Sequence, residues 1–475
     1  MDEKSGNNEK QNEEHENYEE PKKYKDYEKS EEGKKGKPKN RGLLKNQTFR
    51  KVFIVYMLTT FGDWFDALAI QVIVGYRWGV SPLMLALIPI AIALPGVLLS
   101  SVAGVVADRI SQVKIMRVCN LLTAVLSLTI FVAPNMIWLL GLLAVRAAIS
   151  TIYVPAQQAL TRVIVREDQI LQATSFNGLV NQGSKIAGPL LGGFALLLLS
   201  PEWCILFNAC VRFVCFLMLF LVKPPAYLVV GPEVEPQVQI NDHSDALVEQ
   251  KNSFRVMWRE GWTFIFGNKL LRNTLLFGFI GTITIQMIDY QFTSLFRTIA
   301  PTQESFLGWM VAASGLGAVG SILMMNKMNK MNTTLNYGWR LGTGYILIGI
   351  SIVGLGMLSV GQSLLLILLL GLVLGIGNGI FFITFSYCLQ KETHSSMIGR
   401  VFGIQSTLLS MVMLLAPLLG GGLVQLNGAQ NIFVALGLLV LCIGLLGVVF
   451  NTIIWPHHLQ REHSNENNQV KEYSA

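Results

Sequence analysis

The sequence predicts an all-α membrane protein with twelve transmembrane helices in two pseudo-symmetric six-helix bundles. The composition is the first reason: 52% of the residues are hydrophobic and only 14% are charged, whereas a soluble domain carries about 25% charged residues. The second reason is that the charges separate uncharged runs of roughly 20 residues, the length of helix that crosses a bilayer. The third reason is a six-residue motif that occurs once in each half of the chain.

The apolar runs form two sets of six, separated by a polar linker. The expected spans are 52–76, 83–106, 114–133, 136–160, 172–198, 202–222, 271–297, 304–326, 337–360, 362–388, 398–426 and 430–455. The chain therefore divides into a polar tail (1–45), an N-terminal bundle (46–222), a linker (223–270), a C-terminal bundle (271–455) and a second tail (456–475). The first tail has too few apolar residues to bury a core, so we expect it to be disordered.

The end of the linker has the pattern of an amphipathic helix. In Ser253–Asn268 the apolar residues fall on one helical face, and Arg255, Arg259 and Glu260 lie elsewhere. Such a segment is typical of a helix that lies on a membrane surface. We therefore expect it on the cytoplasmic face of the bilayer.

The basic residues indicate the orientation of the chain in the membrane. If the N-terminus is cytoplasmic, the inner loops hold nearly all the lysines and arginines, as the positive-inside rule requires. Only Arg77 and Arg297 approach the outer face, where their side chains can extend to lipid head groups. We therefore expect a multi-pass plasma-membrane protein with both termini cytoplasmic. Topology also explains the net charge of +7, so we expect no nucleic-acid partner.

Several classes of function find no support in the sequence. No Gly-x-x-x-x-Gly-Lys-Ser/Thr loop indicates ATP hydrolysis, so uphill transport has to use an ion gradient. None of the six cysteines has Cys-x-x-Cys spacing, and we expect neither a metal site nor a cofactor. No nucleophile–base arrangement suggests an enzyme. The expected partners are a small-molecule substrate, protons and the lipid bilayer.

The first span carries two acids, Asp63 and Asp66, near its middle. A charge within the bilayer is costly, about 2.5–3.5 kcal/mol or more, so it is usually retained for a function. The two carboxyl groups lie three residues apart on one helix face, where they can carry a proton or attract a cationic drug. Arg146 in the fourth span is the natural partner for one of them. The alternative is that the acids are structural, paired with a basic residue or a backbone amide.

Other polar residues inside the spans extend this candidate proton and substrate site. In the sixth span Asn208 and Arg212 share a face, and we interpret Arg212 as a structural pair. Asn177, Asn181 and Lys185 share a face of the fifth span, where Lys185 needs a cavity or an acid. The full candidate set is Asp63, Asp66, Gln71, Arg146, Asn181, Lys185, Gln286, Asp289 and Asn378. Asn378 and its neighbours Phe381, Phe382 and Phe385, with Gln405 of the eleventh span, suggest an aromatic and polar pocket. The alternative is that these phenylalanines face lipid or only pack between helices.

Two motifs resemble the major facilitator superfamily. One is Gly104-x-x-x-Asp108-Arg109 between the second and third spans, where glycine permits close helix approach. The other is Gly188-Pro189-Leu-Leu-Gly192-Gly193, which recurs as Ala416-Pro-Leu-Leu-Gly-Gly421. The resemblance implies that Asp108, with Gly104 and Arg109, latches the two halves on the cytoplasmic face. It also implies that the second motif is the packing motif of antiporters.

The stretch from Arg146 to Gly193 looks like the branch that contains macrolide-type drug exporters and enterobactin-type siderophore exporters. This resemblance implies a proton-driven exporter, and we expect a monomer that exports drugs or drug-like amphipathic molecules by alternating access. Export of an endogenous metabolite such as a siderophore is an alternative. A more distant alternative is a non-transporting membrane sensor or scaffold that binds a partner through its charged N-terminal arm.

Overall fold

The computed structural model describes residues 43–222, 256, 258–330, 337–394 and 397–455. The expectations for most of the N-terminal tail, for the C-terminal tail from residue 456 and for most of the linker therefore fall outside the described residues. Within these ranges the chain is helical and contains no strand.

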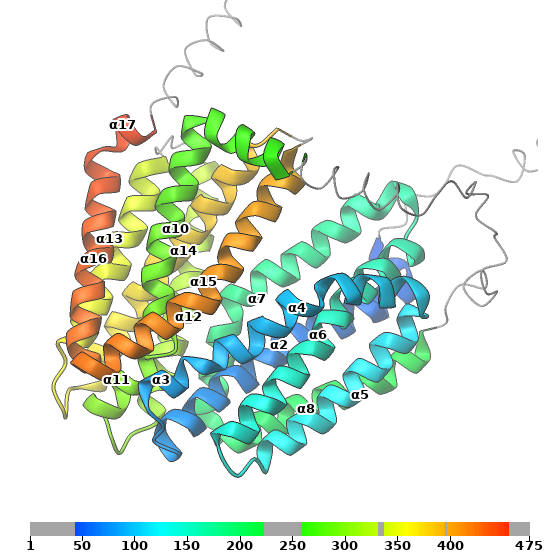
Figure 1. Ribbon diagram of the computed structural model, residues 1–475, viewed down its shortest axis with the longest axis horizontal. Coiled ribbons are helices and arrows are strands. Elements are labelled where there is room, and N and C mark those ends of the chain that lie inside the picture. Colours follow the sequence, from blue (N-terminus) through cyan, green and yellow to red (C-terminus); the bar gives the residue numbers. More distant parts are fainter. Residues whose placement is uncertain (1–42, 223–255, 257, 331–336, 395–396, 456–475) are drawn as a thin grey trace, which may run out of the picture.

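Twelve long helices make up the described part of the chain (Figure 1). The first six are α2 (Gln47–Val72), α4 (Leu87–Arg109), α5 (Gln112–Phe131), α6 (Met136–Ile164), α7 (Ile170–Leu198) and α8 (Pro201–Met218). The second six are α10 (Lys269–Asp289), α12 (Ser305–Lys330), α13 (Tyr337–Gly356), α14 (Leu364–Glu392), α15 (Ile398–Asn427) and α16 (Ala429–Val449). Shorter elements are η1 (Leu43–Lys45), η2 (Ile73–Arg77), α3 (Pro82–Leu85), η3 (Glu167–Gln169), η4 (Leu219–Leu221), α11 (Phe292–Ile299) and α17 (Asn451–Ile454).

Eleven of the described helices are long and apolar enough to cross a membrane. The twelfth is α7, which contains Asn177, Asn181 and Lys185, and these polar residues lower its hydropathy. A helix is thus present at each of the twelve expected spans, with ends close to those predicted. One span differs: the seventh, expected over 271–297, is broken after Asp289 and continues as the separate helix α11.

The twelve helices form two bundles, each with its own apolar core. One bundle comprises α2 to α8 and the other α10 to α16, and their axes diverge from the end where α3 and α11 lie (Figure 1). Contacts between the bundles involve mainly α7 with α12, and α15 with α3 and α4. We call the end that holds residues 78–81 and 300–304 the closed end. The opposite end, which holds residues 110–111 and 165–169, is the open end.

The repeated motif makes equivalent contacts in the two bundles. Gly192 of α7 packs on α2, where a Cβ atom would lie 2.9 Å from the carbonyl oxygen of Trp64. Gly420, at the same motif position in α15, packs on α10, where a Cβ would overlap the carbonyl oxygen of Met287. Because a Cβ does not fit at either place, glycine allows each motif helix to touch the first helix of its own bundle.

The next glycine of each motif touches the other bundle. A Cβ at Gly193 would lie 2.6 Å from the backbone nitrogen of Ala312 in α12, and one at Gly421 would lie 2.8 Å from the carbonyl oxygen of Pro82 in α3. Both contacts lie toward the closed end. The sequence repeat therefore corresponds to a structural repeat that brings the two bundles together.

The helix at the end of the linker packs against protein. Residues 258–267 are helical, and Ile265 is buried among Leu271 of α10, Leu389 of α14 and Ile404 of α15. Glu260 forms an ion pair with Arg400 at the start of α15. We expected the apolar face of this helix to lie on the membrane, but Ile265 on that face is covered by the C-terminal bundle instead.

The residues of the expected latch lie toward the open end. Helix α4 ends at Arg109. Among the described residues, no atom of another helix lies within 4 Å of the place where a Cβ at Gly104 would be, so none of the described helices makes the expected close approach there in this conformation. The reason is that the bundles diverge toward this end. The side chain of Asp108 lies outside the described residues.

Candidate functional site

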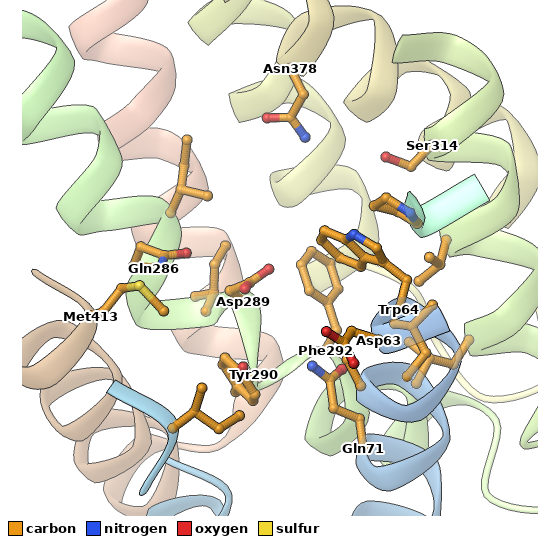
Figure 2. Close-up of a pocket in the computed structure, with 18 of the residues that line it drawn as sticks. Asp63, Trp64, Gln71, Gln286, Asp289, Tyr290, Phe292, Ser314, Asn378 and Met413 are labelled. Carbon is orange, nitrogen blue, oxygen red and sulfur yellow. The ribbon is translucent and has the colours of Figure 1, made fainter. Parts of the chain in front are cut away.

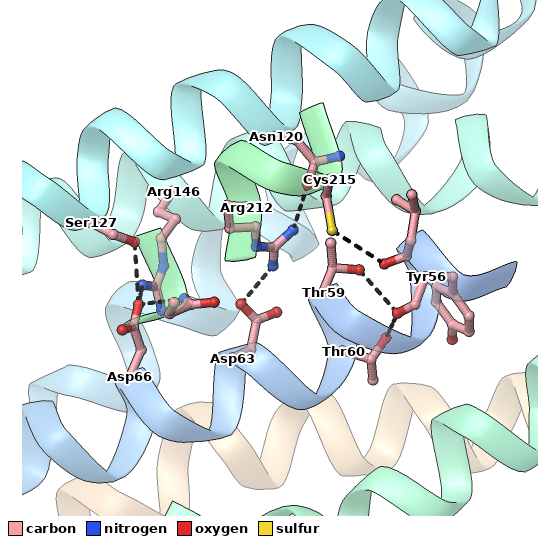
Figure 3. Close-up of polar contacts among 12 residues, drawn as sticks. Tyr56, Thr59, Thr60, Asp63, Asp66, Asn120, Ser127, Arg146, Arg212 and Cys215 are labelled. Carbon is pink, nitrogen blue, oxygen red and sulfur yellow. Dashed lines mark hydrogen bonds and ion pairs between the residues drawn. The ribbon is translucent and has the colours of Figure 1, made fainter. Parts of the chain in front are cut away.

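Asp66 lies at the centre of a buried polar cluster in the N-terminal bundle (Figure 3). Its Oδ2 forms an ion pair with Arg146 of α6 and accepts hydrogen bonds from Asn208 of α8 at 2.8 Å and from Ser127 of α5 at 3.3 Å. The Asp66 side chain is fully buried and that of Arg146 is 13% exposed. Three other helices therefore hold one carboxylate oxygen. The other oxygen, Oδ1, has no hydrogen-bond partner among the described residues.

Asp63 forms its ion pair with a different basic residue, Arg212. The side chain of Arg212, on α8, lies 2.5 Å from Asp63 Oδ1 and also donates to Asn120 Oδ1 at 3.4 Å (Figure 3). Arg212 is 6% exposed, whereas Asp63 is 46% exposed. The sequence suggests a structural pair for Arg212 but does not identify Asp63 as its partner. The two acids of α2 are thus matched by two arginines, and the four charges cancel.

A cavity of about 730 Å³ lies between the two bundles (Figure 2). Six of the nine candidate site residues line it: Asp63, Gln71, Arg146, Gln286, Asp289 and Asn378. Apolar and aromatic side chains, among them Trp64, Tyr290, Phe292, Met310 and Met413, form much of the remaining wall. The residues come from both halves of the chain, so relative movement of the bundles changes the shape of the cavity.

Three of the candidate residues lie outside the cavity lining. Asp66 is buried beside Arg146, which itself lines the cavity. Asn181 and Lys185 are exposed on α7, closer to the open end than the lining residue Pro189, and Lys185 donates to Gln182 at 3.0 Å. In this conformation α7 presents Pro189 to the cavity, and Asn181 and Lys185 are not among the lining residues, so their role in binding stays a prediction.

The aromatic side of the pocket also differs from the expectation. Phe381 stacks on Tyr345 and on Phe385, with ring centroids 4.4 and 5.5 Å apart, inside the C-terminal bundle. Of this group Asn378 lines the cavity, whereas the three phenylalanines and Gln405 are not among the lining residues. The aromatic wall is instead formed by Trp64 of α2, by Tyr290, which follows the end of α10, and by Phe292, the first residue of α11.

Polar contacts hold the closed end together. Arg297 of α11 donates to the carbonyl oxygens of Gly75 and Val80, each at 3.1 Å, and Gln291 donates to that of Pro82 at 2.9 Å. Arg77 forms ion pairs with Glu202 of its own half and with Glu304 of the other. The expectation that Arg77 and Arg297 extend to lipid head groups is therefore wrong, because both are engaged by protein groups.

Substitution of Arg297 by alanine is expected to favour separation of the bundles at the closed end. Hydrogen bonds from a charged donor contribute about 1.5–3 kcal/mol each, so the closed population should fall at least roughly tenfold. Spin labels at Ser200 and Gln303, exposed residues at this end of opposite bundles, would report the longer distance. Arg77→Ala is the control with a smaller effect, because its ion pairs are more exposed. An unchanged distance distribution in Arg297→Ala would contradict this role.

The family of the chain follows from comparison with known proteins. The sequence matches the Major Facilitator Superfamily over residues 52–414, more than half of its length. The chain belongs to the Major Facilitator Superfamily. It is therefore a membrane transporter of this superfamily, with a substrate that the match does not define.

Relatives within the Major Facilitator Superfamily cover most of the chain. The uncharacterized MFS-type transporter YfiS of Bacillus subtilis (strain 168) is 25% identical over 394 residues, which is 82% of this chain and 90% of YfiS. YkuC of the same organism, also an uncharacterized MFS-type transporter, is 23% identical and covers 79% of this chain and 87% of its own length. The multidrug efflux pump Tap of Mycolicibacterium fortuitum is 27% identical over 194 residues, 40% of this chain and 44% of Tap.

Solved structures share the fold. The nucleoside transporter NupG is similar with a TM-score of 0.60 at 13% identity, over 85% of this chain and 98% of its own. A bacterial homologue of the human lysosomal transporter Spinster, in an inward-facing and unoccupied conformation, has a TM-score of 0.61 at 12% identity, over 87% of this chain and 98% of its own. At these identities the likeness concerns the fold alone.

Proposed function

We propose that this transporter exports drug-like amphipathic small molecules across the plasma membrane, driven by protons, by alternating access. The observation that carries the proposal is the cavity between the bundles. Its volume of about 730 Å³ lies in the range that holds a drug-sized ligand. Its wall combines apolar and aromatic side chains with a few charged ones, which suits an amphipathic molecule with an apolar body and a polar or charged group.

The open end is proposed to face the cytoplasm. Basic residues are concentrated there, as in the loops that stay inside under the positive-inside rule. They include Arg109, Lys114, Arg117, Arg162, Arg166, Lys269, Arg272 and Lys391. In the conformation described, the transporter would then be inward-open and ready to load substrate from the cytoplasm.

Asp66 and Arg146 are proposed to couple protons to transport. Arg146 links the fully buried carboxylate to the cavity, so protonation of Asp66 weakens the ion pair and frees the arginine at the cavity wall. A proton that moves inward releases about 2.3 kcal/mol per 100 mV of membrane potential. That free energy can drive the change between the inward-open and outward-open conformations when Asp66 and Arg146 separate.

The proposal predicts substrate-dependent proton movement in proteoliposomes that contain the full-length protein. A panel of amphipathic drugs, first ranked by susceptibility of cells with and without expression, supplies the test compounds. A pH-sensitive dye inside the vesicles should respond when an exported drug is added under a proton gradient, and empty liposomes should give no such response. Transport that continues unchanged after the proton gradient has been abolished would contradict proton coupling.

The similarity to Tap, which is a multidrug efflux pump, favours drugs over an endogenous metabolite as the class of exported molecule. Deletion of the gene tests the metabolite alternative: if a siderophore is the substrate, growth should fail under iron limitation. A sensor or scaffold would instead lose its function when residues 1–40 are removed, whereas an exporter should keep its activity.

A further inference from the structure

We infer that the cavity selects lipophilic organic molecules that carry one positive charge, with Asp289 as their counter-ion. This inference rests on the proposed function, because it names the substrate class of the same cavity. It depends on the charges near the cavity, on the position of Asp289 at a helix end and on the aromatic wall.

The charges around the cavity leave Asp289 in excess. Asp63 and Asp66 are matched by Arg212 and Arg146, so these four groups add no net charge. Asp289 lines the cavity and forms no ion pair within the described part of the chain. Lys185 is not one of the lining residues. The lining site therefore carries one uncompensated negative charge, which matches a single positive charge on the ligand.

The position of Asp289 strengthens this preference. It is the last residue of α10, and its side chain points into the cavity between the two bundles (Figure 2). The last carbonyl groups of a helix have no partners within the helix and carry a partial negative charge, which stabilises a nearby cation. The carboxylate and the helix end therefore act in the same direction.

The aromatic residues add a second kind of attraction. Trp64, Tyr290 and Phe292 line the same cavity as Asp289. The face of an aromatic ring attracts a cation, by about 0.5–2 kcal/mol depending on how well water is excluded. An amine or quaternary ammonium group attached to an apolar body thus has partners for both of its parts. A neutral molecule of the same shape retains only the apolar contacts.

A pair of isosteric ligands tests the inference. The purified full-length protein in detergent is equilibrated with a radiolabelled aryl-trimethylammonium compound or with its uncharged tert-butyl isostere. The wild type should bind the cation at least about tenfold more tightly, which corresponds to roughly 1.4 kcal/mol. In Asp289→Asn this preference should vanish, while binding of the isostere stays within a factor of about two. Asp289→Glu should keep the preference.

A control acid and two adverse outcomes complete the test. Glu304 lies at the closed end outside the cavity lining, so Glu304→Gln should keep the cation preference. Equal binding of both compounds by the wild type, or a preference that survives in Asp289→Asn, would overturn the cation assignment alone. Absence of binding for both compounds would overturn the assignment together with the proposed function.

Discussion

Substitution of Asp66 by asparagine is expected to abolish substrate-driven proton movement and to destabilise the protein. The asparagine has nearly the same shape, but it leaves the largely buried Arg146 without its counter-charge. Removal of one partner of a buried ion pair typically costs about 3–5 kcal/mol. Melting of the purified full-length protein, together with the proteoliposome assay, measures the two losses separately.

The double variant Asp66→Asn with Arg146→Gln separates coupling from stability. It removes both charges, so the thermal stability should recover most of the loss, because no buried charge remains unpaired. Proton movement should stay absent, since the group proposed to carry the proton is missing. If the double variant moved protons at the wild-type rate, Asp66 would be a structural residue and the coupling site would have to lie elsewhere.

Substitution of Gly421 by valine is expected to prevent the closed end from closing. A Cβ at this position would lie 2.8 Å from both the Cβ of Ala86 and the carbonyl oxygen of Pro82 in the other bundle. Overpacking typically costs about 1–3 kcal/mol, which corresponds to a roughly 5- to 150-fold loss of the closed population. Because alternating access needs both conformations, transport should fall by a comparable factor.

Gly422 provides the matched control for Gly421. It is the next residue of α15, and among the described residues no atom of another element lies within 4 Å of the place where its Cβ would be. Gly422→Val should therefore leave transport close to that of the wild type. The spin labels at Ser200 and Gln303 should move apart in Gly421→Val and not in Gly422→Val. Equal transport by the two variants would show that this contact is unimportant for the cycle.

Much of the fold could be predicted because its signals are local. Hydropathy along the chain predicted the helices to within a few residues at most ends, since an apolar run of the right length has few alternatives in a bilayer. The repeated motif predicted the relation between the halves, and the equivalent contacts of Gly192 and Gly420 are its structural basis. The cost of buried charge likewise directed attention to Asp66 and Arg146, which the structure brings together.

The remaining features depend on contacts between residues far apart in the sequence. Arg212 required a partner, but only the packing of α8 against α2 identifies Asp63. The break between α10 and α11 is accompanied by a hydrogen bond from Gln291 to Pro82 in the other bundle, for which the local sequence gives no signal. The surroundings of Lys185 could not be predicted for a related reason: helical spacing shows which residues share a face, but not what that face meets, and here Lys185 donates to Gln182 of its own helix.

The glycines of α15 have a mechanical consequence. Gly403 and Gly421 lie about five helical turns apart and so project from the same side of the helix. At Gly421 that side is pressed against Pro82 and Ala86, whereas at Gly403 it meets nothing within 4 Å. One end of α15 therefore packs against the other bundle at Gly421, whereas the same side of the helix has room at Gly403. We therefore expect that, when Gly421 separates from Pro82 and Ala86, the Gly403 end of α15 has room to approach α4 near Gly104, where no described atom of another helix lies within 4 Å.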